Sequence, residues 1–326
     1  MKKIVIDACG ADAGLLPVVR GVAKALRQGI EFFPVLVGPE SELKLLLEEA
    51  GVKPEQYEIL DAQDAITNED PPTCVFAGRE EASLVKAYGR LKSDDSCCGM
   101  ISPGSTGALL VGSICRLGLL PGLKFPVLAS ALPCGVENLV CLVDCGANVE
   151  CTGKDLVRFA KMGDVFARCH CGIEDPKVGL MNVGREPGKG TALLKEAYEL
   201  ISQLPLNFVG NLEGSDIVSG YADVIVTDGL CGNILLKSTE AAGQLAMKIL
   251  EQEGAGEDPE LIARLKKAIF KKLEFNSQGA ATFMGPKKNV VKMHGCANED
   301  TTVAAILHVL NLWERDFIGK LSQALQ

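Results

Sequence analysis

The residues best suited to chemistry lie in two glycine-rich turns, at positions 210–214 and 227–233, each of which follows an apolar strand. Glycine tolerates positive φ angles and lets a backbone approach an anion closely. At the carboxyl edge of a parallel sheet, such turns expose backbone N–H groups and helix N-termini. Ordinary strand-to-helix turns also need glycine for geometry, and that simpler interpretation stays open for either turn alone. Two turns together favour an anion site that includes Asn211, Glu213, Asp228, Gly229, Gly232 and Asn233.

Alternating strands and helices must position these turns. Helical patterns at Val18–Arg27 and Glu40–Ala50 each follow a short apolar strand, which is a βαβ signature. The alternation predicts an α/β fold with a mostly parallel sheet covered by helices. The expected strands are Lys3–Ile6, Pro34–Val37, Gly99–Ile101, Val127–Ser130, Leu139–Val143, Val178–Asn182, Leu206–Val209, Asp223–Val226 and Asn289–Lys292.

No linker or fixed repeat divides the chain, so we expect a single domain over residues 1–326. Ser238–Glu274 differs from the rest because Gly254 and Pro259 bound a break between two helical segments. This predicts a helical hairpin insertion at about 238–275. Its second arm pairs apolar residues at helical spacing with a basic face, which fits either membrane-surface docking or core packing with a solvated face.

The composition limits the function classes. The 326 residues carry a formal net charge of −9, which argues against a nucleic-acid surface because phosphate contacts need clustered Lys and Arg. The chain has no apolar run long enough for a membrane span and no signal-peptide pattern. Thirteen cysteines without regular spacing favour reduced thiols in a cytoplasmic protein. Neither a metal centre nor a cofactor is predicted.

Seven blocks, in order along nearly the whole chain, resemble those of the phosphate acyltransferase family. They are IDACGAD (Ile6–Asp12), SPGSTGALL (Ser102–Leu110), DCGANVEC (Asp144–Cys151), GLMNVGREPGKG (Gly179–Gly190), FVGNLEGSDI (Phe208–Ile217), DVIVTDGLCGNILLK (Asp223–Lys237) and MHG (Met293–Gly295). The resemblance implies a three-layer α/β/α sandwich similar to isocitrate and isopropylmalate dehydrogenases. It also implies a homodimer, with a helical hairpin that contributes to weak peripheral membrane contact.

The implied reaction joins inorganic phosphate to the acyl group of an acyl-[acyl-carrier-protein], or another acyl-thioester donor, to give acyl phosphate for phospholipid synthesis. Phosphate attack on a thioester needs an anion site, oxyanion stabilisation and positioning more than a protein nucleophile. Lys189 would place a point charge beside a backbone turn. The residues expected to bind substrate are Asp7, Gly10, Asp12, Gly104, Ser105, Thr106, Gly107, Asn148, Asn211, Glu213, Gly229 and Gly232; those expected to be catalytic are Lys189, Asp228, Asn233, His294 and Cys296.

Structural roles, without any part in chemistry, remain open for several of these residues. Asp7 and Asp12 flank the first glycine turn and could cap a helix, whereas the polar residues of the two later turns could simply shape those turns. The chain also departs from the family pattern, with Ala13 in place of a histidine, Ser215 in place of an arginine and Asp300 in place of a lysine. These changes weaken the attraction to an acidic carrier protein.

Cys296 opens a second mechanism, because it replaces a serine of the family pattern two residues after His294. The N-terminus of the helix expected at Thr301–Trp313 would favour its thiolate as a nucleophile. It would then hold a small acyl group as a thioester that phosphate cleaves. This alternative, a small-acyl transferase that forms acetyl phosphate, is similar to the alpha subunit of glycine reductase component C, although a passive exchange is also open. A non-catalytic scaffold subunit is a third possibility. A dehydrogenase is disfavoured because no GxGxxG opens the first helix.

Overall fold

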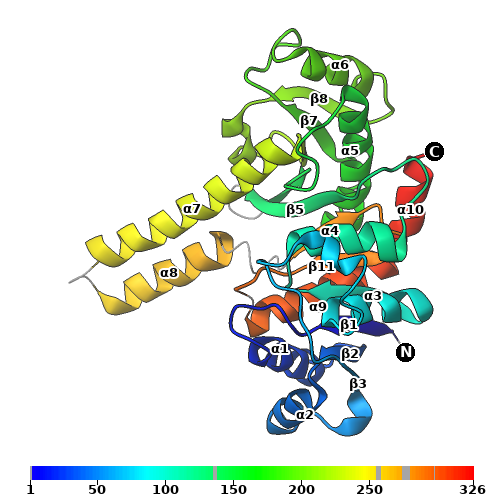
Figure 1. Cartoon of the computed structure of the whole chain (residues 1–326). Coiled ribbons are helices and arrows are strands. Elements are labelled where there is room, and N and C mark those ends of the chain that lie inside the picture. Colours follow the sequence, from blue (N-terminus) through cyan, green and yellow to red (C-terminus); the bar gives the residue numbers. More distant parts are fainter. Residues whose placement is uncertain (1, 135–137, 255–257, 274–279, 297) are drawn as a thin grey trace. The chain divides into compact units, whose positions relative to one another are not determined.

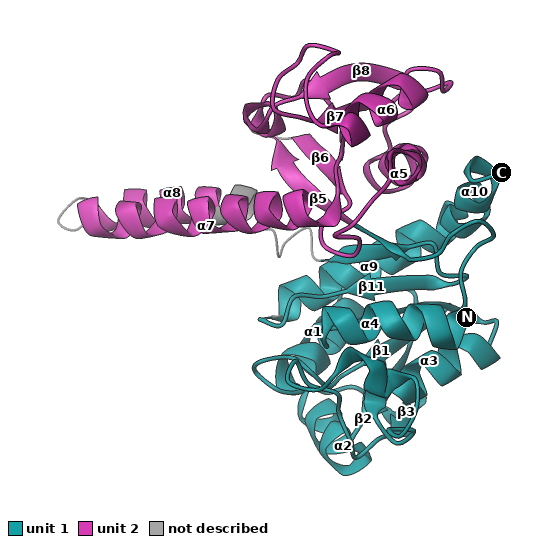
Figure 2. Cartoon of the chain, turned by 45° about the horizontal axis from the view of Figure 1, so that its top comes forward, with its two compact units in different colours: residues 1–128, 279–326 teal, residues 129–278 magenta. Residues whose placement is uncertain are grey.

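A computed structural model describes residues 2–134, 138–254, 258–273, 280–296 and 298–326 (Figure 1). The chain forms two compact units, one of residues 1–128 with 279–326 and one of residues 129–278 (Figure 2). The boundary falls inside a strand, at a point where the sequence shows no linker composition. That the whole chain acts as a single acyltransferase domain stays a prediction.

In unit 1 the strands lie in the order β3-β2-β1-β4-β11-β10, and every neighbouring pair is parallel except β10 with β11. The strands are β1 Lys3–Asp7, β2 Phe33–Gly38, β3 Glu58–Asp61, β4 Cys97–Ser102, β10 Ala281–Met284 and β11 Asn289–Lys292. Those predicted from sequence are present within one or two residues at each end. β3 and β10, which were not predicted, are four residues long.

Helices cover the sheet of unit 1. They are α1 Leu16–Arg27, α2 Glu40–Glu49, α3 Ser83–Ser93, α4 Thr106–Gly112, α9 Glu299–Glu314 and α10 Phe317–Ala324. α1 packs on α2 and α9, whereas α3 packs on β1, β2 and β4. Proline at the start of α1 fits a position whose N–H has no helical partner, and Asn298 caps α9 by accepting from the amides of Asp300 and Thr301.

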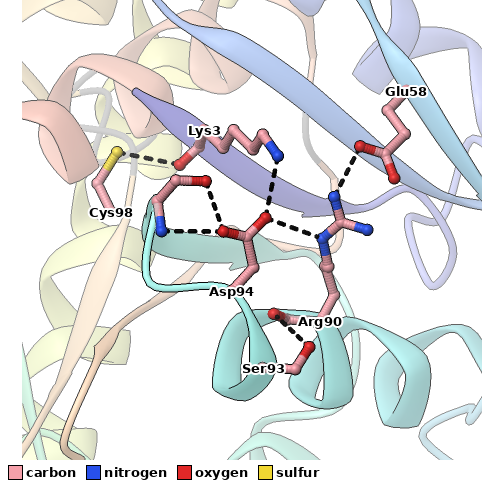
Figure 3. Close-up of polar contacts among 7 residues, drawn as sticks. Lys3, Glu58, Arg90, Ser93, Asp94 and Cys98 are labelled. Atoms are coloured by element: carbon pink, nitrogen blue, oxygen red, sulfur yellow. Dashed lines mark hydrogen bonds and ion pairs between the residues drawn. The ribbon is translucent and has the colours of Figure 1, made fainter. Parts of the chain in front are cut away.

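A polar network ties the amino ends of strands β1, β3 and β4 in unit 1 (Figure 3). The Asp94 carboxylate pairs with Lys3 of β1 at 3.0 Å and with Arg90 of α3 at 3.3 Å. Arg90 reaches Glu58 of β3 at 2.7 Å. Hydrogen bonds from Ser96 and Lys3 hold the pKa of Asp94 well below its usual range. These contacts link the amino ends of β1 and β3 to α3 and to the segment before β4.

In unit 2 the strand order is β5-β6-β9-β7-β8, with only the β5–β6 pair antiparallel. The strands are β5 Val127–Cys134, β6 Asn138–Val143, β7 Lys177–Met181, β8 Asn207–Leu212 and β9 Val224–Val226. The helices are α5 Gly153–Phe166, α6 Ala192–Ile201, α7 Gly229–Glu253 and α8 Pro259–Leu273. α5 packs on β6, β7 and β9, α6 packs on β8, and α7 contacts β6. The predicted class, a mostly parallel sheet with helices on both sides, is confirmed.

α7 and α8 run side by side and form the helical pair expected at about 238–275 (Figure 1). Lys266 and Glu251 join the two helices at 3.0 Å. The first helix begins at Gly229 rather than near Ser238, because the Asp228 side chain caps it there. Residues 255–257, between the two helices, lie outside the described part of the chain. Within the described part of the chain, none of the helices combines the length and apolarity that crossing a bilayer requires.

Candidate active site

Three segments of unit 1 meet at the carboxyl ends of neighbouring strands. They follow β1, β4 and β11, which lie side by side in parallel. The Met293 amide donates to the Ser102 carbonyl at 2.9 Å, and the Asp12 amide donates to the Gly295 carbonyl at 2.8 Å. The first, second and last family-like blocks are therefore adjacent, although more than 280 positions separate the outer two in sequence.

Asp7 is buried at the end of β1 and accepts two hydrogen bonds. The Ser102 hydroxyl donates to its Oδ2 at 2.7 Å, and the Cys9 amide donates to its Oδ1 at 3.2 Å. The Ser102 hydroxyl oxygen also accepts from the Gly104 amide at 3.0 Å. Burial raises the pKa of Asp7 to about 6, partly offset by these hydrogen bonds and by Lys292. Asp7 does not cap a helix; it holds Ser102 and, through it, the turn at Gly104.

Gly10 and Gly104 allow the two turns to touch. Gly10 has φ of +90°, and a Cβ at this position would lie 2.8 Å from the Gly104 Cα. Gly107 has another role, since its Cβ would lie 2.8 Å from the Pro72 ring. Ser105 stands at the N-cap of α4 without a capping side-chain bond, and Thr106 follows as the first helical residue. Both side chains are half-buried.

Lys292 is a candidate that the sequence reasoning missed. It ends β11, and its half-buried ammonium group donates to the carbonyl of Pro103 at 3.1 Å and to that of Met293. A cation at the end of an apolar strand, two residues before His294, is the signal that could have found it. Lys292 brings positive charge to the edge where Asp7 and the Gly104 turn meet.

His294 and Cys296 form a close pair at the same edge. The Cys296 Sγ lies 3.0 Å from the His294 Nδ1, and both side chains are exposed. An imidazole at this distance is a suitable base for a thiol. The helix expected after Cys296 is present as α9, but Asn298 Oδ1 already accepts its first amides, and Glu299 and Asp300 add negative charge to its first turn. The imidazole, rather than the helix N-terminus, is thus the better activating group.

In unit 2 a buried carboxylate organises the loop after β6. Asp144 Oδ1 accepts from the amides of Gly146 and Ala147, each at 2.9 Å. Its Oδ2 accepts from the amide of Asn148 at 2.9 Å and from the Asn148 side chain at 2.5 Å. Burial raises the pKa of Asp144 against these four hydrogen bonds. The Asn148 side chain, expected to bind substrate, here binds Asp144.

The loop after β6 packs against the start of α7. A Cβ on Gly229 would lie 2.8 Å from the Asn148 backbone, and one on Gly232 would lie 1.8 Å from the Asp144 carbonyl oxygen. The Gly229 amide donates to the Asn148 carbonyl at 2.7 Å, and the Gly232 amide donates to the Asp228 carbonyl at 2.9 Å. The anion contacts expected from these two amides are therefore not available in this arrangement, and close packing explains both glycines.

Asp228 and Asn233 lie at the start of α7. Asp228 Oδ1 accepts from the Cys231 amide at 2.9 Å, which is helix capping, one of the roles left open for a turn carboxylate. Asn233 lies in the first turns of α7 with its side chain exposed, and a Cβ on Gly146 would lie 3.7 Å from it. The second glycine-rich turn is thus a cap and the first turn of a helix.

The first glycine-rich turn is shorter than predicted because β8 continues to Leu212. Gly210, with φ of +93°, sits inside β8 beside a register shift in its pairing with β7. Asn211 is therefore a strand residue, and its Nδ2 donates to the Glu186 carbonyl at 2.8 Å. Its buried Oδ1 has no hydrogen-bond partner among the described residues. A buried acceptor of this kind is available to a ligand that donates a hydrogen bond.

Glu213, Asp216 and Arg185 form a second polar group beyond β8. Asp216 is buried and accepts from the Glu213 amide at 2.8 Å. The Arg185 guanidinium binds both Asp216 oxygens, with Nε to Oδ2 at 3.2 Å. Burial alone would raise the pKa of Asp216, but Arg185 and the Glu213 amide together outweigh it and hold the pKa below its usual range. Arg185 was missed because its role depends on a partner 31 residues away.

Lys189 stands in the loop after β7 with its side chain exposed. Its backbone is fixed, because its amide donates to the Glu186 carbonyl at 3.1 Å and its carbonyl accepts from the buried Asn182 side chain at 3.2 Å. Asn211 holds the same loop through Glu186. Lys189, Asn211 and Glu213 thus share one edge of unit 2. Among the described residues no group of three His, Cys, Asp or Glu side chains could hold a metal ion.

The sheet order and the polar loops at the carboxyl ends of its strands define a class with known structures. A phosphotransacetylase from Streptococcus pyogenes has the same fold, with a TM-score of 0.62 at 20% identity over 95% of this chain and 94% of that one. Isocitrate dehydrogenase from Methylococcus capsulatus also resembles the chain, with a TM-score of 0.50 at 12% identity over 98% of this chain and 88% of that one. The class is therefore an α/β fold shared by transacylases and dehydrogenases.

Sequence comparison gives the family. The family described as "Fatty acid synthesis protein" matches residues 2–320. A protein of Clostridium novyi (strain NT) named phosphate acyltransferase is 34% identical over 329 residues, which cover 99% of this chain and 98% of that protein. The chain belongs to this acyltransferase family, which confirms the resemblance first seen in the seven sequence blocks.

Proposed function

We propose that the protein transfers an acyl group from a thioester to inorganic phosphate and releases acyl phosphate. A phosphate oxygen attacks the thioester carbonyl, a C–O bond forms, the C–S bond breaks, and the carrier thiol leaves with a proton. The observation that carries this proposal is the meeting of three family-like segments at one sheet edge of unit 1, together with the family itself.

In unit 1 the proposed phosphate groups are the turn at Gly104–Gly107 and Lys292. Asp7 and Ser102 fix the turn, and Gly10 lets the neighbouring turn approach it. Lys292 supplies a positive charge that a phosphate needs in a partly buried site. His294 would orient the reactants or move a proton, as an imidazole does near neutral pH.

In unit 2 we keep Lys189, Asn211 and Glu213 as substrate-binding candidates. The buried Oδ1 of Asn211 supports a contact with a protonated phosphate or with an amide of the carrier. Lys189 supplies a positive charge on a fixed loop. Asp228 and Asn148 act in this proposal only by shaping the loops that bear them.

The distance between Cys296 and His294 favours a second mechanism. His294 would take the thiol proton, and the Cys296 sulfur would attack the thioester and hold the acyl group. The carrier thiol would leave with the proton from His294. Phosphate would then attack the acyl-cysteine, release acyl phosphate and regenerate the cysteine.

The finer expectations also stand here as proposals. We propose that the protein works in the cytoplasm as a homodimer and touches membranes weakly at their surface. Apolar side chains on α7 and α8, such as Leu245 at 58% exposed and Ile249 at 50%, support such contacts. Sedimentation with and without lipid vesicles tests the dimer and the membrane contact. A monomer that does not bind vesicles would contradict both.

A direct assay incubates the purified protein with phosphate and with carrier-protein or coenzyme A thioesters of several chain lengths, then traps acyl phosphate as hydroxamate. Product from at least one thioester is expected. No product from any of them would favour a non-catalytic scaffold subunit.

Trapping distinguishes the two mechanisms. If the covalent route operates, a labelled acyl group should be trapped on wild-type protein without phosphate, and Cys296→Ser should abolish the label. Cys231→Ser removes the other exposed cysteine and should keep the label. Full activity of Cys296→Ser would exclude the covalent route and leave direct attack by phosphate.

A further inference from the structure

Unit 2 contains a pocket that the proposed chemistry does not use. Its volume is about 420 Å³. It is lined by Lys177, Arg185, Val209, Ser219, Gly220 and Tyr221. Figure 1 shows β7 and β8, the strands that contribute Lys177 and Val209, next to each other.

The pocket lies on the face of the sheet opposite α6. The Phe208 ring packs edge-on against Tyr198 of α6, with 5.2 Å between the ring centroids. Val178 pairs with Phe208, and neighbouring strand residues point to opposite faces, so Lys177, the residue before Val178, faces away from that helix. The Tyr221 hydroxyl lies 3.5 Å from the Val209 carbonyl oxygen, at the outer limit of a hydrogen bond.

Two cationic side chains, Lys177 and Arg185, line this partly apolar pocket. The Arg185 guanidinium lies 5.1 Å from the centroid of the Tyr221 ring and is paired with Asp216. Lys177 takes part in none of the ion pairs between described side chains. Its backbone amide donates to Asp223 at 2.8 Å, which fixes its position at the start of β7. Asp216 balances Arg185, and the Asp223 carboxylate lies at the Lys177 backbone, so the pocket presents two cationic side chains with carboxylates close behind them.

Two cationic side chains and an aromatic wall suit an anionic, partly apolar ligand. The phosphodiester that links a phosphopantetheine arm to its carrier bears one negative charge and continues into an aliphatic chain. The pocket also shares Arg185 with the loop after β7, and Val209 is two residues before Asn211 in β8. A ligand anchored here would therefore lie beside the polar loops of the proposed site.

We propose that this pocket binds the phosphate end of the phosphopantetheine arm of the acyl-thioester donor. The proposal rests on the proposed acyl transfer and names how the donor is held. Two sources carry this arm: a carrier protein, in which the arm ends in a phosphodiester, and free coenzyme A, in which it ends in a diphosphate.

The test compares donors that do and do not carry the phosphate. Acyl-coenzyme A, acyl-carrier protein and the acyl thioester of N-acetylcysteamine share the reacting group, but the last lacks the phosphate. Wild-type KM should be about tenfold or more higher for the N-acetylcysteamine thioester. Lys177→Gln should raise KM for the phosphate-bearing donors about threefold to fivefold, as expected for one exposed charge contact, and leave KM for the truncated donor unchanged.

The matched control is Lys195→Gln, which removes a lysine from α6 on the opposite face of the sheet. It should change no KM value. A change that appears only with coenzyme A or only with the carrier protein identifies the source of the arm. Equal KM changes for all three donors, or none in Lys177→Gln, would overturn the proposal.

Direct binding separates failure of this inference from failure of the proposed function. Free phosphopantetheine, titrated calorimetrically, should bind wild-type protein and bind Lys177→Gln about threefold to fivefold more weakly, whether or not acyl phosphate is formed. Absence of binding to wild-type protein refutes the pocket assignment even if the protein is an active acyltransferase. Weaker carrier-protein kinetics with unchanged phosphopantetheine binding also refutes it, because Lys177 would then attract the carrier's acidic surface.

Discussion

Replacing Asp7 by asparagine should change how the stability of unit 1 depends on pH. Burial raises the pKa of this carboxyl from 3.8 to about 6. Below pH of about 3 the group is protonated in both the folded and the unfolded chain. As the pH rises from about 3 to about 6, the unfolded chain releases this proton first, so the folded state loses stability. A shift of about two pKa units corresponds to about 3 kcal/mol, since each unit is about 1.4 kcal/mol.

Asparagine should fit the same site. Its Oδ1 can accept from the Cys9 amide, and its Nδ2 can donate to the Ser102 oxygen, which has a second lone pair beside the one that accepts from Gly104. The variant cannot release a proton here. Its stability relative to wild type should therefore increase by about 2.4 kcal/mol between pH 4 and pH 7, which is most of the full difference.

Fluorescence provides the assay because the chain has one tryptophan, Trp313, which lies in α9 of unit 1. Urea unfolding curves of wild type and Asp7→Asn, measured from pH 4 to pH 8, should diverge as the pH rises. Asp95→Asn removes a 98% exposed carboxyl from the same unit and should follow wild type throughout. Parallel curves for wild type and Asp7→Asn would show that Asp7 does not keep its proton in the folded chain.

Three further substitutions test the loops, each by urea or thermal unfolding. Gly232→Ala should lower the free energy of unfolding by about 3 kcal/mol or more, because its Cβ would lie 1.8 Å from the Asp144 carbonyl oxygen. The control Gly89→Ala, in open space on α3, should raise the free energy of unfolding by about 0.5–1 kcal/mol. Equal effects of the two substitutions would contradict the close packing at Gly232. Asp144→Asn should cost about 2–4 kcal/mol, since an amide nitrogen would face donors now bound to an oxygen, and a neutral result would show that the loop does not need the carboxylate. Arg185→Gln should cost about 1–3 kcal/mol by leaving buried Asp216 without its charged partner, and an unchanged midpoint would rule that pair out as a stabilising contact.

Much of the fold could be predicted from sequence, because the strands are short apolar runs with turns at both ends. β11 was predicted without error, and β1 and β2 within one residue at each end. β3 was missed because four residues with charged ends have little strand signal. Gly210 was interpreted as a turn because glycine commonly ends strands, but pairing with β7 carries β8 through it.

Several residues of the candidate site could be placed at strand ends from sequence, but their contacts could not. Local pattern placed Asp7, Gly104 and His294 at strand ends, and parallel pairing brings those ends together. The contacts of Lys292 and Arg185 depend on residues far away in sequence, which no local pattern encodes. The role of Gly232 was predicted wrongly because a glycine-rich turn can serve either anion binding or close packing. The Asp144 loop beside Gly232, which is distant in sequence, shows that close packing explains this glycine.

Acyl transfer to phosphate can be observed directly by phosphorus NMR during a reaction of purified protein with an acyl thioester and phosphate. We expect a new acyl phosphate signal that grows in step with thiol release, one product for each thiol, and that disappears when phosphate is omitted. Thiol release without the acyl phosphate signal would mean that the protein hydrolyses thioesters, and neither product from any donor would mean that it is not an acyltransferase.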